Sequence, residues 1–223
     1  MSVRYKLRVL ACATRKLEFS MTLAEITKFS DKKFLKLYVK AVEFAARKHA
    51  GQARKGTTTP YLSHCLAVSA LVMENGGDGD QAIAALLHDT IEDCGVTYVE
   101  LKKRFGAKVA RIVEDCSDAH GPQKAPWLER KSKHLKHLKK VSSSTLLVSI
   151  CDKLHNGLMT TRDAKRIGNK VWSRFNEPSM ISWYYRQLFE IFQKRASTQN
   201  KEFKYLKREF EAIVCEIERL DPA

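Results

Sequence analysis

Apolar residues recur every three or four positions along most of the chain, which is the spacing of one face of an α-helix. Such stripes cover residues 34–46, 62–72, 83–91, 109–116, 146–158 and 203–220, and the segments 128–140 and 183–193 also fit helices. The sequence contains no convincing strand and no internal repeat. We therefore predict an all-α fold, a compact bundle of many helices.

Glycine, proline and capping residues predict where these helices begin and end. The polar segments 51–60 and 75–80 are predicted loops, as is 117–127. Thr97 and Glu100 have the spacing of a capping box that begins a short helix. The helix that begins near residue 83 is expected to run without a break to about residues 93–95.

The length of the chain suits one globular domain, since 223 residues of which 44% are hydrophobic can bury a real core. We predict an N-terminal extension at residues 1–30, the main domain at 31–197, and a C-terminal helix at 198–223 packed on that domain. Residues 1–20 are expected to be a dispensable extension, or to result from assigning the translation start at Met1 when it lies at Met21, because the sequence from Met21 is more typical of a protein N-terminus.

Cysteine usage and hydropathy predict a cytoplasmic protein. None of the six cysteines forms a Cys-x-x-Cys pair, so we expect reduced thiols. No apolar run approaches the roughly 20 residues that span a bilayer, and a membrane partner is not expected. The net charge of +15 favours anionic partners such as nucleic acid, a membrane surface or a phosphorylated small molecule, and charge alone does not choose among them.

The segment "AALLHDTIED" places His88 and Asp89 at the polar end of an apolar helix, with Glu92 and Asp93 four residues further on. In a helix this spacing puts four ionisable groups on adjoining faces. Three neighbouring carboxylates repel one another unless a cation or protons intervene, which a divalent metal would supply. Taken alone, the same pattern also fits a solvated helix end.

Two further segments favour a metal site. His64 lies near the start of a predicted apolar helix, where a histidine is either a metal ligand or a hydrogen-bonded core residue. Asp152 lies inside the apolar segment "LLVSICDKLHN", where a carboxylate is either a metal ligand or half of a salt bridge. Together, His64, His88, Asp89 and Asp152 offer two imidazoles and two carboxylates. That mixed set suits Mn²⁺, Fe²⁺ or similar ions with open positions for water and substrate, unlike a thiolate-rich structural zinc site.

The order His…His-Asp…Asp is the signature of the HD phosphohydrolase superfamily, and the surrounding segments resemble one branch of it. The hydrolase domain of RelA/SpoT alarmone enzymes is similar to the segments "FAARKHAGQARKGTTTPYLSHCLAVSALV", "AALLHDTIEDCGVTYVELKKRFGAKVARIVEDCSDA", "LERK" and "DKLHN". The later "WSRFN" and "WYYRQL" resemble the stand-alone small alarmone hydrolases. The resemblance covers roughly residues 35–195 and implies an HD-domain bundle.

This resemblance implies a Mn²⁺-dependent enzyme of the stringent response that removes the 3′-pyrophosphate of (p)ppGpp, giving GDP or GTP and pyrophosphate; Fe²⁺, Co²⁺ or Zn²⁺ are other possible metals. The resemblance implies that His64, His88, Asp89 and Asp152 are the metal ligands. It also implies that Glu92 deprotonates the attacking water, and that Asp93 assists Glu92 or handles the leaving group. The implied substrate contacts are Arg54, Lys55, Arg130, Lys131, Asn156 and Tyr184. Cys151 and Ser63 depart from the residues frequent in relatives, without removing a ligand.

Other functions stay open at this point. The same chemistry would serve a (p)ppApp hydrolase, or a phosphatase of another nucleotide such as NADPH. A different class is a nucleic-acid-binding or regulatory module on an HD scaffold, which the charge favours, whereas the intact ligand set and the lack of a known nucleic-acid-binding motif speak against it. The oligomeric state is left open.

Overall fold

The computed structural model describes residue 29 and residues 31–118 and 125–221, and these residues form helices and loops without a β-strand. The elements are α3 (Lys32–Lys48), α4 (Leu62–Glu74), α5 (Gly79–Leu87), α6 (Thr90–Cys94), α7 (Tyr98–Phe105), α8 (Ala107–Cys116), α9 (Trp127–Leu138), α10 (Ser143–Ile167), η1 (Gly168–Arg174), η2 (Pro178–Met180), α11 (Ile181–Arg195), η3 (Ala196–Thr198) and α12 (Lys201–Leu220). The predicted all-α bundle is confirmed. The predicted extension at residues 1–30 lies outside the described residues apart from Phe29.

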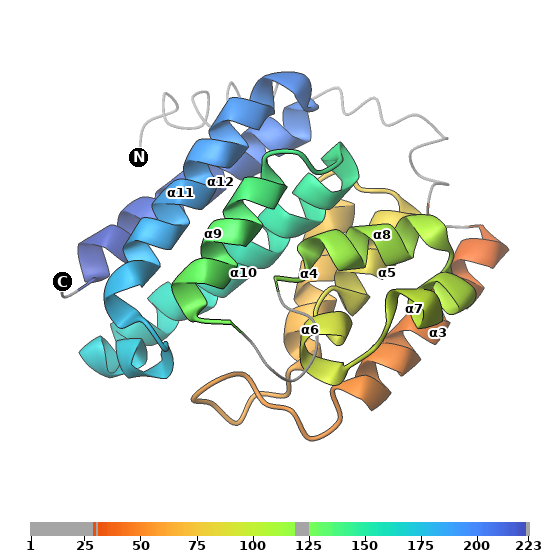
Figure 1. Ribbon diagram of the computed structural model, residues 1–223, viewed down its shortest axis with the longest axis horizontal. Coiled ribbons are helices and arrows are strands. Elements are labelled where there is room, and N and C mark those ends of the chain that lie inside the picture. Colours follow the sequence, from red (N-terminus) through yellow and green to blue (C-terminus); the bar gives the residue numbers. More distant parts are fainter. Residues whose placement is uncertain (1–28, 30, 119–124, 222–223) are drawn as a thin grey trace, which may run out of the picture.

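Helix α10 crosses the middle of the bundle, with α3 to α8 on one side and α11 and α12 on the other (Figure 1). It packs against α4, α5 and α8, and also against α12 and η1. Such contacts bury every residue of α10 from Leu146 to Asp152. Because the helix lies between both halves, polar residues on it reach the interior of the bundle.

Helix α5 is the most deeply buried of the short helices. Every residue from Gln81 to Leu87 is buried, and α5 packs against α3, α4, α8 and α10. A helix that is apolar on all sides has to lie inside the protein, which explains this position. Its start is fixed by a capping box between Asp78 and Gln81.

The predicted continuous helix through His88 and Asp89 is wrong. Helix α5 ends at Leu87, the two residues form a turn, and α6 begins at Thr90, whose hydroxyl donates to the Leu87 carbonyl at 2.7 Å. Neighbouring residues on a regular helix point about 100° apart and do not face each other. The backbone of both residues stays in the right-handed helical region, and the side chains meet with His88 Nε2 2.8 Å from Asp89 Oδ2.

Helix α12 packs against α10 and α11. The helices approach closely at Gly157 of α10, where an added Cβ would lie 2.4 Å from Cγ2 of Ile213 in α12 and 3.1 Å from Cε1 of Tyr185 in α11. Glycine is therefore needed for this helix pair to approach so closely. The division between a domain at 31–197 and a C-terminal helix at 198–223 stays a prediction. Among the described residues, no helix is both long and apolar enough to cross a membrane.

Candidate metal centre

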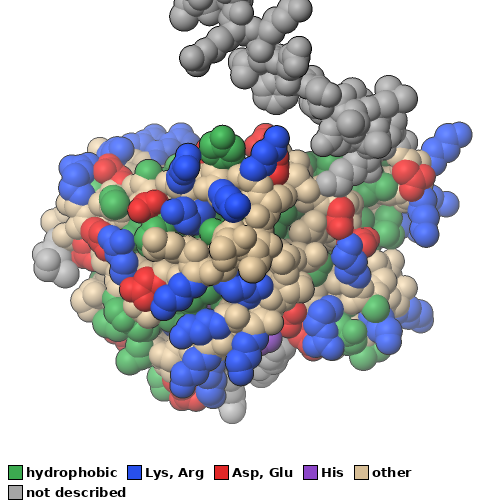
Figure 2. All heavy atoms as spheres, turned by 90° about the horizontal axis from the view of Figure 1, so that it is seen from above, with side chains coloured by type: hydrophobic (Ala, Val, Ile, Leu, Met, Phe, Trp, Pro, Cys, Tyr) green, Lys and Arg blue, Asp and Glu red, His purple; other side chains and the backbone are tan. Residues whose placement is uncertain are grey.

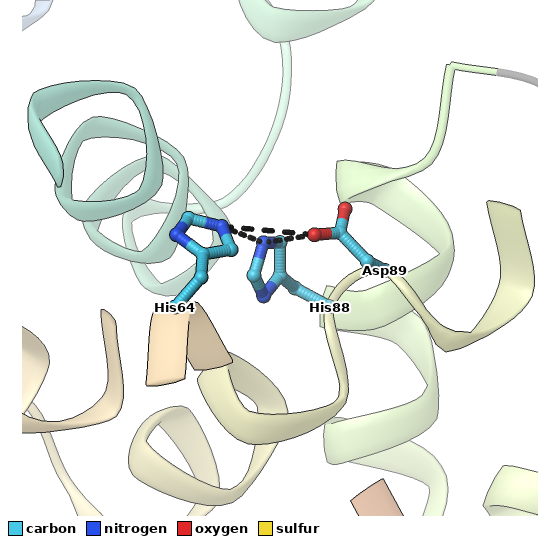
Figure 3. A group of neighbouring side chains, drawn as sticks. All are labelled: His64, His88 and Asp89. Atoms are coloured by element: carbon cyan, nitrogen blue, oxygen red, sulfur yellow. Dashed lines mark hydrogen bonds and ion pairs between the residues drawn. The ribbon is translucent and has the colours of Figure 1, made fainter. Parts of the chain in front are cut away.

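The four predicted ligands come from three separate segments and meet inside the bundle. His64 lies in the first turn of α4, His88 and Asp89 lie in the turn between α5 and α6, and Asp152 lies in α10. Figure 3 shows the ring nitrogens of His64 and His88 and a carboxylate oxygen of Asp89 pointing toward one another. The two histidines and Asp152 are buried, and Asp89 is partly buried.

The atoms that bind metals in such side chains converge. His64 Nε2 lies 3.2 Å from His88 Nε2 and 3.2 Å from Asp152 Oδ1. His88 Nε2 lies 2.8 Å from Asp89 Oδ2 and 3.5 Å from Asp152 Oδ1. The fold thus brings together all four residues that the sequence singled out.

Contacts on the far side of the imidazole rings bear on which nitrogens are free to bind a metal. His88 Nδ1 lies 2.8 Å from the Ala85 carbonyl oxygen, which can only accept, so Nδ1 carries the proton and Nε2 of the neutral ring is an acceptor. His64 Nδ1 faces His155 Nδ1 at 2.8 Å. When both rings are protonated on Nδ1, their Nε2 lone pairs face each other and the carboxylates. Such a cluster of acceptors requires a cation, and the donor set fits a divalent metal ion.

Charges around the cluster agree with this requirement. Burial alone would raise the pKa of Asp152, but Lys153 and His88 hold it well below its usual value. Burial also opposes protonation of His88, yet Asp89 and Asp152 raise its pKa well above the ordinary value. Without a metal ion, the raised pKa of His88 means that a second proton, on Nε2, faces the two carboxylates. A divalent cation would take the place of that proton.

The two oxygens of Asp152 have different partners. Oδ2 pairs with Lys153 Nζ at 2.7 Å, while Oδ1 faces the two imidazoles and accepts a hydrogen bond from Asn156 Nδ2 at 2.6 Å. The sequence left open whether Asp152 is a ligand or half of a salt bridge. The structure shows a salt bridge on one oxygen and leaves the other directed at the histidines.

Asp89 has a partner that sequence reasoning missed. The Tyr61 hydroxyl donates to Asp89 Oδ2 at 2.5 Å. Burial and the charge of Asp89 raise the pKa of Tyr61, so its hydroxyl remains a donor. The ring of His49 lies against Tyr61, with 5.0 Å between centroids. The available signal was the position of Tyr61, directly after Pro60 and three residues before His64.

Glu92 and Asp93 lie on α6 and face different neighbours. Glu92 Oε1 lies 3.8 Å from Arg130 Nη1, whereas Asp93 Oδ2 accepts a hydrogen bond from Gln52 Nε2 at 3.1 Å. Both carboxylates follow the His88–Asp89 turn directly, and their catalytic roles stay predictions.

Arg54 and Lys55, predicted as substrate contacts, lie in the loop before α4 and reach in different directions. Arg54 Nη2 donates to Asn156 Oδ1 at 3.2 Å, and its Nη1 lies 3.5 Å from His155 Nδ1. Burial, with His64 and Arg54 nearby, lowers the pKa of His155 to about 4. Lys55 Nζ donates to Asn176 Oδ1 at 2.9 Å, away from these residues.

Arg130 and Lys131 share one buried carboxylate, Asp118, which sequence reasoning also missed. Arg130 Nη1 lies 2.5 Å from Asp118 Oδ1, and Lys131 Nζ pairs with Oδ2. Burial would raise the pKa of Asp118, but Lys131 and Arg130 hold it well below its usual value. Lys131 Nζ also lies 5.2 Å from the ring centroid of Tyr184, whose buried hydroxyl has no hydrogen-bond partner among the described residues.

Comparison with known proteins agrees with this geometry. The family described as "HD domain" matches residues 41–177, which include the whole cluster. The chain belongs to the HD domain family. The matched region of the HD domain ends shortly before η2 and α11.

Two relatives carry the same descriptive name, guanosine-3′,5′-bis(diphosphate) 3′-pyrophosphohydrolase MESH1. The Xenopus tropicalis protein is 38% identical over 150 residues, 66% of this chain and 80% of the relative. The human protein is 36% identical over 148 residues, 65% of this chain and 79% of the relative.

A solved structure shares the fold. It belongs to a metazoan ortholog of SpoT that hydrolyses ppGpp, and it superposes with a TM-score of 0.61 at 24% identity. The match covers 82% of this chain and 94% of that one. At this identity the likeness supports the fold of this HD domain.

Proposed function

We propose that this HD domain hydrolyses the 3′-pyrophosphate of (p)ppGpp and releases pyrophosphate together with GDP or GTP, within the stringent response. The observation that carries the proposal is the convergence of two imidazole Nε2 atoms and two carboxylates in a buried centre. Two relatives of 36–38% identity that are named for this reaction support the choice of substrate.

His64, His88, Asp89 and Asp152 are the proposed ligands, and Mn²⁺ is the proposed ion because it accepts mixed nitrogen and oxygen ligands. When bound, a divalent ion lowers the pKa of water so that hydroxide is present near neutral pH. The Nδ1 bond of His88 to Ala85 and the Tyr61 bond to Asp89 would orient these ligands.

Glu92 and Asp93 divide the proton transfers of the proposed reaction. Attack on the phosphorus bound to the ribose 3′ oxygen breaks that P–O bond, so one proton leaves the attacking water and one reaches the 3′ oxygen. Glu92 takes up the first proton, with Arg130 at 3.8 Å to orient its carboxylate. Asp93, held by Gln52, supplies the second or assists Glu92.

Positive charge around the site supports an anionic substrate. Arg54 and Lys55 are proposed to contact the base and the phosphates, and Arg130 and Lys131 the phosphates. Asn156 is proposed to lie near the ribose and a phosphate, and Tyr184 to pack against the nucleotide. The molecule as a whole has a net charge of +15, and Lys and Arg side chains predominate over Asp and Glu side chains on the face shown in Figure 2. Such a field raises the local concentration of a multiply charged nucleotide.

The test is a product assay with purified protein and Mn²⁺ that offers ppGpp, pppApp and NADPH side by side. GDP and pyrophosphate from ppGpp are the expected products. Cleavage of pppApp alone, or release of phosphate from NADPH alone, would assign the same chemistry to a different nucleotide. Protein that binds Mn²⁺ but cleaves none of the three would refute the proposed substrate class.

A further inference from the structure

Arg54 is connected to two of the proposed metal ligands by two separate routes. Its Nη1 lies 3.5 Å from His155 Nδ1, which in turn faces His64 Nδ1 at 2.8 Å. Its Nη2 donates to Asn156 Oδ1, and Asn156 Nδ2 donates to Asp152 Oδ1 at 2.6 Å. One guanidinium thus lies behind both a histidine and a carboxylate of the centre.

The first route passes through the pair of imidazole rings. A histidine that binds a metal through Nε2 keeps its proton on Nδ1, so His64 Nδ1 would donate to the single lone pair of His155 Nδ1 at 2.8 Å. The Arg54 guanidinium has no acceptor and lies 3.5 Å from the same His155 nitrogen. Its position is therefore compatible with this arrangement and supports the ring of His155 behind His64.

The second route fixes the amide of Asn156. Because Arg54 donates to Oδ1, the amide group must turn its Nδ2 toward Asp152. The donated hydrogen bond then holds the Asp152 oxygen that faces both imidazoles.

Backbone hydrogen bonds within the loop hold the main chain of Arg54 in place. The Arg54 backbone nitrogen donates to the Thr59 carbonyl at 2.8 Å, and its carbonyl accepts from the Thr57 nitrogen at 2.9 Å. An isolated antiparallel bridge pairs Ala53 with Pro60 and joins the two ends of the loop. With both backbone groups bonded, the loop holds the Arg54 backbone at a place from which the guanidinium reaches His155 and Asn156 on α10.

We propose that Arg54 is a positioning residue for the metal site, which supports the ring of His64 through His155 and orients Asp152 through Asn156. This role rests on the metal ligands proposed above and adds to the substrate contact that the resemblance implies for Arg54. It requires two donors at fixed separation, which an arginine has and a lysine lacks.

The test measures Mn²⁺ affinity by electron paramagnetic resonance or calorimetry without substrate. Losing a direct partner of a ligand weakens metal binding about 10- to 100-fold. Arg54 acts one contact further out but on two ligands, so Arg54→Lys and Arg54→Met should both bind Mn²⁺ about tenfold more weakly. If Arg54 acted by charge alone, Arg54→Lys would bind Mn²⁺ with the affinity of the wild type, and Arg54→Met would bind Mn²⁺ more tightly than the wild type. Lys55→Met is the matched control, because it removes a charge from the same loop without touching either route.

His155 provides a second, independent test. His155→Phe removes the acceptor and should weaken Mn²⁺ binding as Arg54→Lys does, while His155→Gln, whose carbonyl accepts from His64, should restore part of it. Equal Mn²⁺ affinity of wild type and all Arg54 and His155 variants would overturn the positioning role and leave the proposed hydrolysis intact. Wild-type protein that binds no divalent ion would overturn the ligand assignment, and the positioning role with it. Unchanged circular dichroism of each variant shows that the affinities compare folded proteins.

Discussion

Replacement of Lys153 by methionine should destabilise the protein through the buried carboxylate that it leaves behind. Lys153 Nζ lies 2.7 Å from Asp152 Oδ2, and the two side chains are only 18% and 8% exposed. Removing one partner of a buried ion pair costs about 3–5 kcal/mol, because the remaining charge is uncompensated. Since Lys153 keeps some exposure to solvent, we expect a loss of about 3 kcal/mol in the free energy of unfolding.

Urea unfolding in EDTA and in Mn²⁺ is the assay. A metal at about one hundred times its dissociation constant stabilises the native state by about 2.7 kcal/mol. In the Lys153→Met variant the ion would also neutralise Asp152, so Mn²⁺ should stabilise the variant more than the wild type. The difference between the two proteins should therefore be largest in EDTA and shrink when Mn²⁺ is added.

The matched control is Lys133→Met, which breaks an exposed pair with Glu129 at 2.6 Å. Exposed pairs of this kind are worth about 0.2–1 kcal/mol. A Lys153→Met variant that loses no more stability in EDTA than Lys133→Met would refute the view that Lys153 compensates a buried charge.

Three further outcomes are expected. His88→Ala should abolish Mn²⁺ binding and activity together, measured as metal content and turnover; full activity would remove it from the ligand set. Glu92→Gln should keep the metal and lose most of the turnover, whereas wild-type rates would assign the proton transfer elsewhere. Asp118→Asn should cost about 1.5–3 kcal/mol at pH 7, since it removes charged hydrogen bonds to its two cationic partners. The pKa of Asp118 is depressed in the folded protein, so its contribution is present above the unfolded pKa of about 3.9 and is lost as the pH falls toward the folded value. Urea unfolding of wild type and variant should therefore converge in acid, and a difference independent of pH would contradict this assignment.

The helices could be predicted from the sequence because their determinants are local. Apolar stripes and capping residues such as Thr97, whose side chain accepts from the Glu100 nitrogen at 3.1 Å, act within a few positions. The break at His88 and Asp89 was missed because the stripe continues through it. Both residues keep right-handed helical dihedral angles, so the apolar pattern carries no sign of the break.

The ligand types could also be predicted, but their partners could not. Tyr61 and Asp89 are 28 positions apart, and His64 and His155 are 91 apart. Their contacts depend on how α4 and the α5–α6 turn pack against α10, which periodicity does not reveal. Asp118 was passed over for the same reason, since its place in the sequence suggests an ordinary loop residue and its burial arises only from packing.

One short segment of α10 connects these observations. Asp152 faces the histidines, Lys153 neutralises its outer oxygen, His155 lies behind His64, and Asn156 connects to Arg54. Successive residues of a helix point in directions about 100° apart, so five positions suffice to contact the ligands from several sides. Since the other ligands belong to α4 and the α5–α6 turn, a bound metal ion would tie α10 to both. Metal binding should therefore stabilise the packing of these three segments together, and any change that shifts α10 should weaken the metal site before it unfolds the bundle.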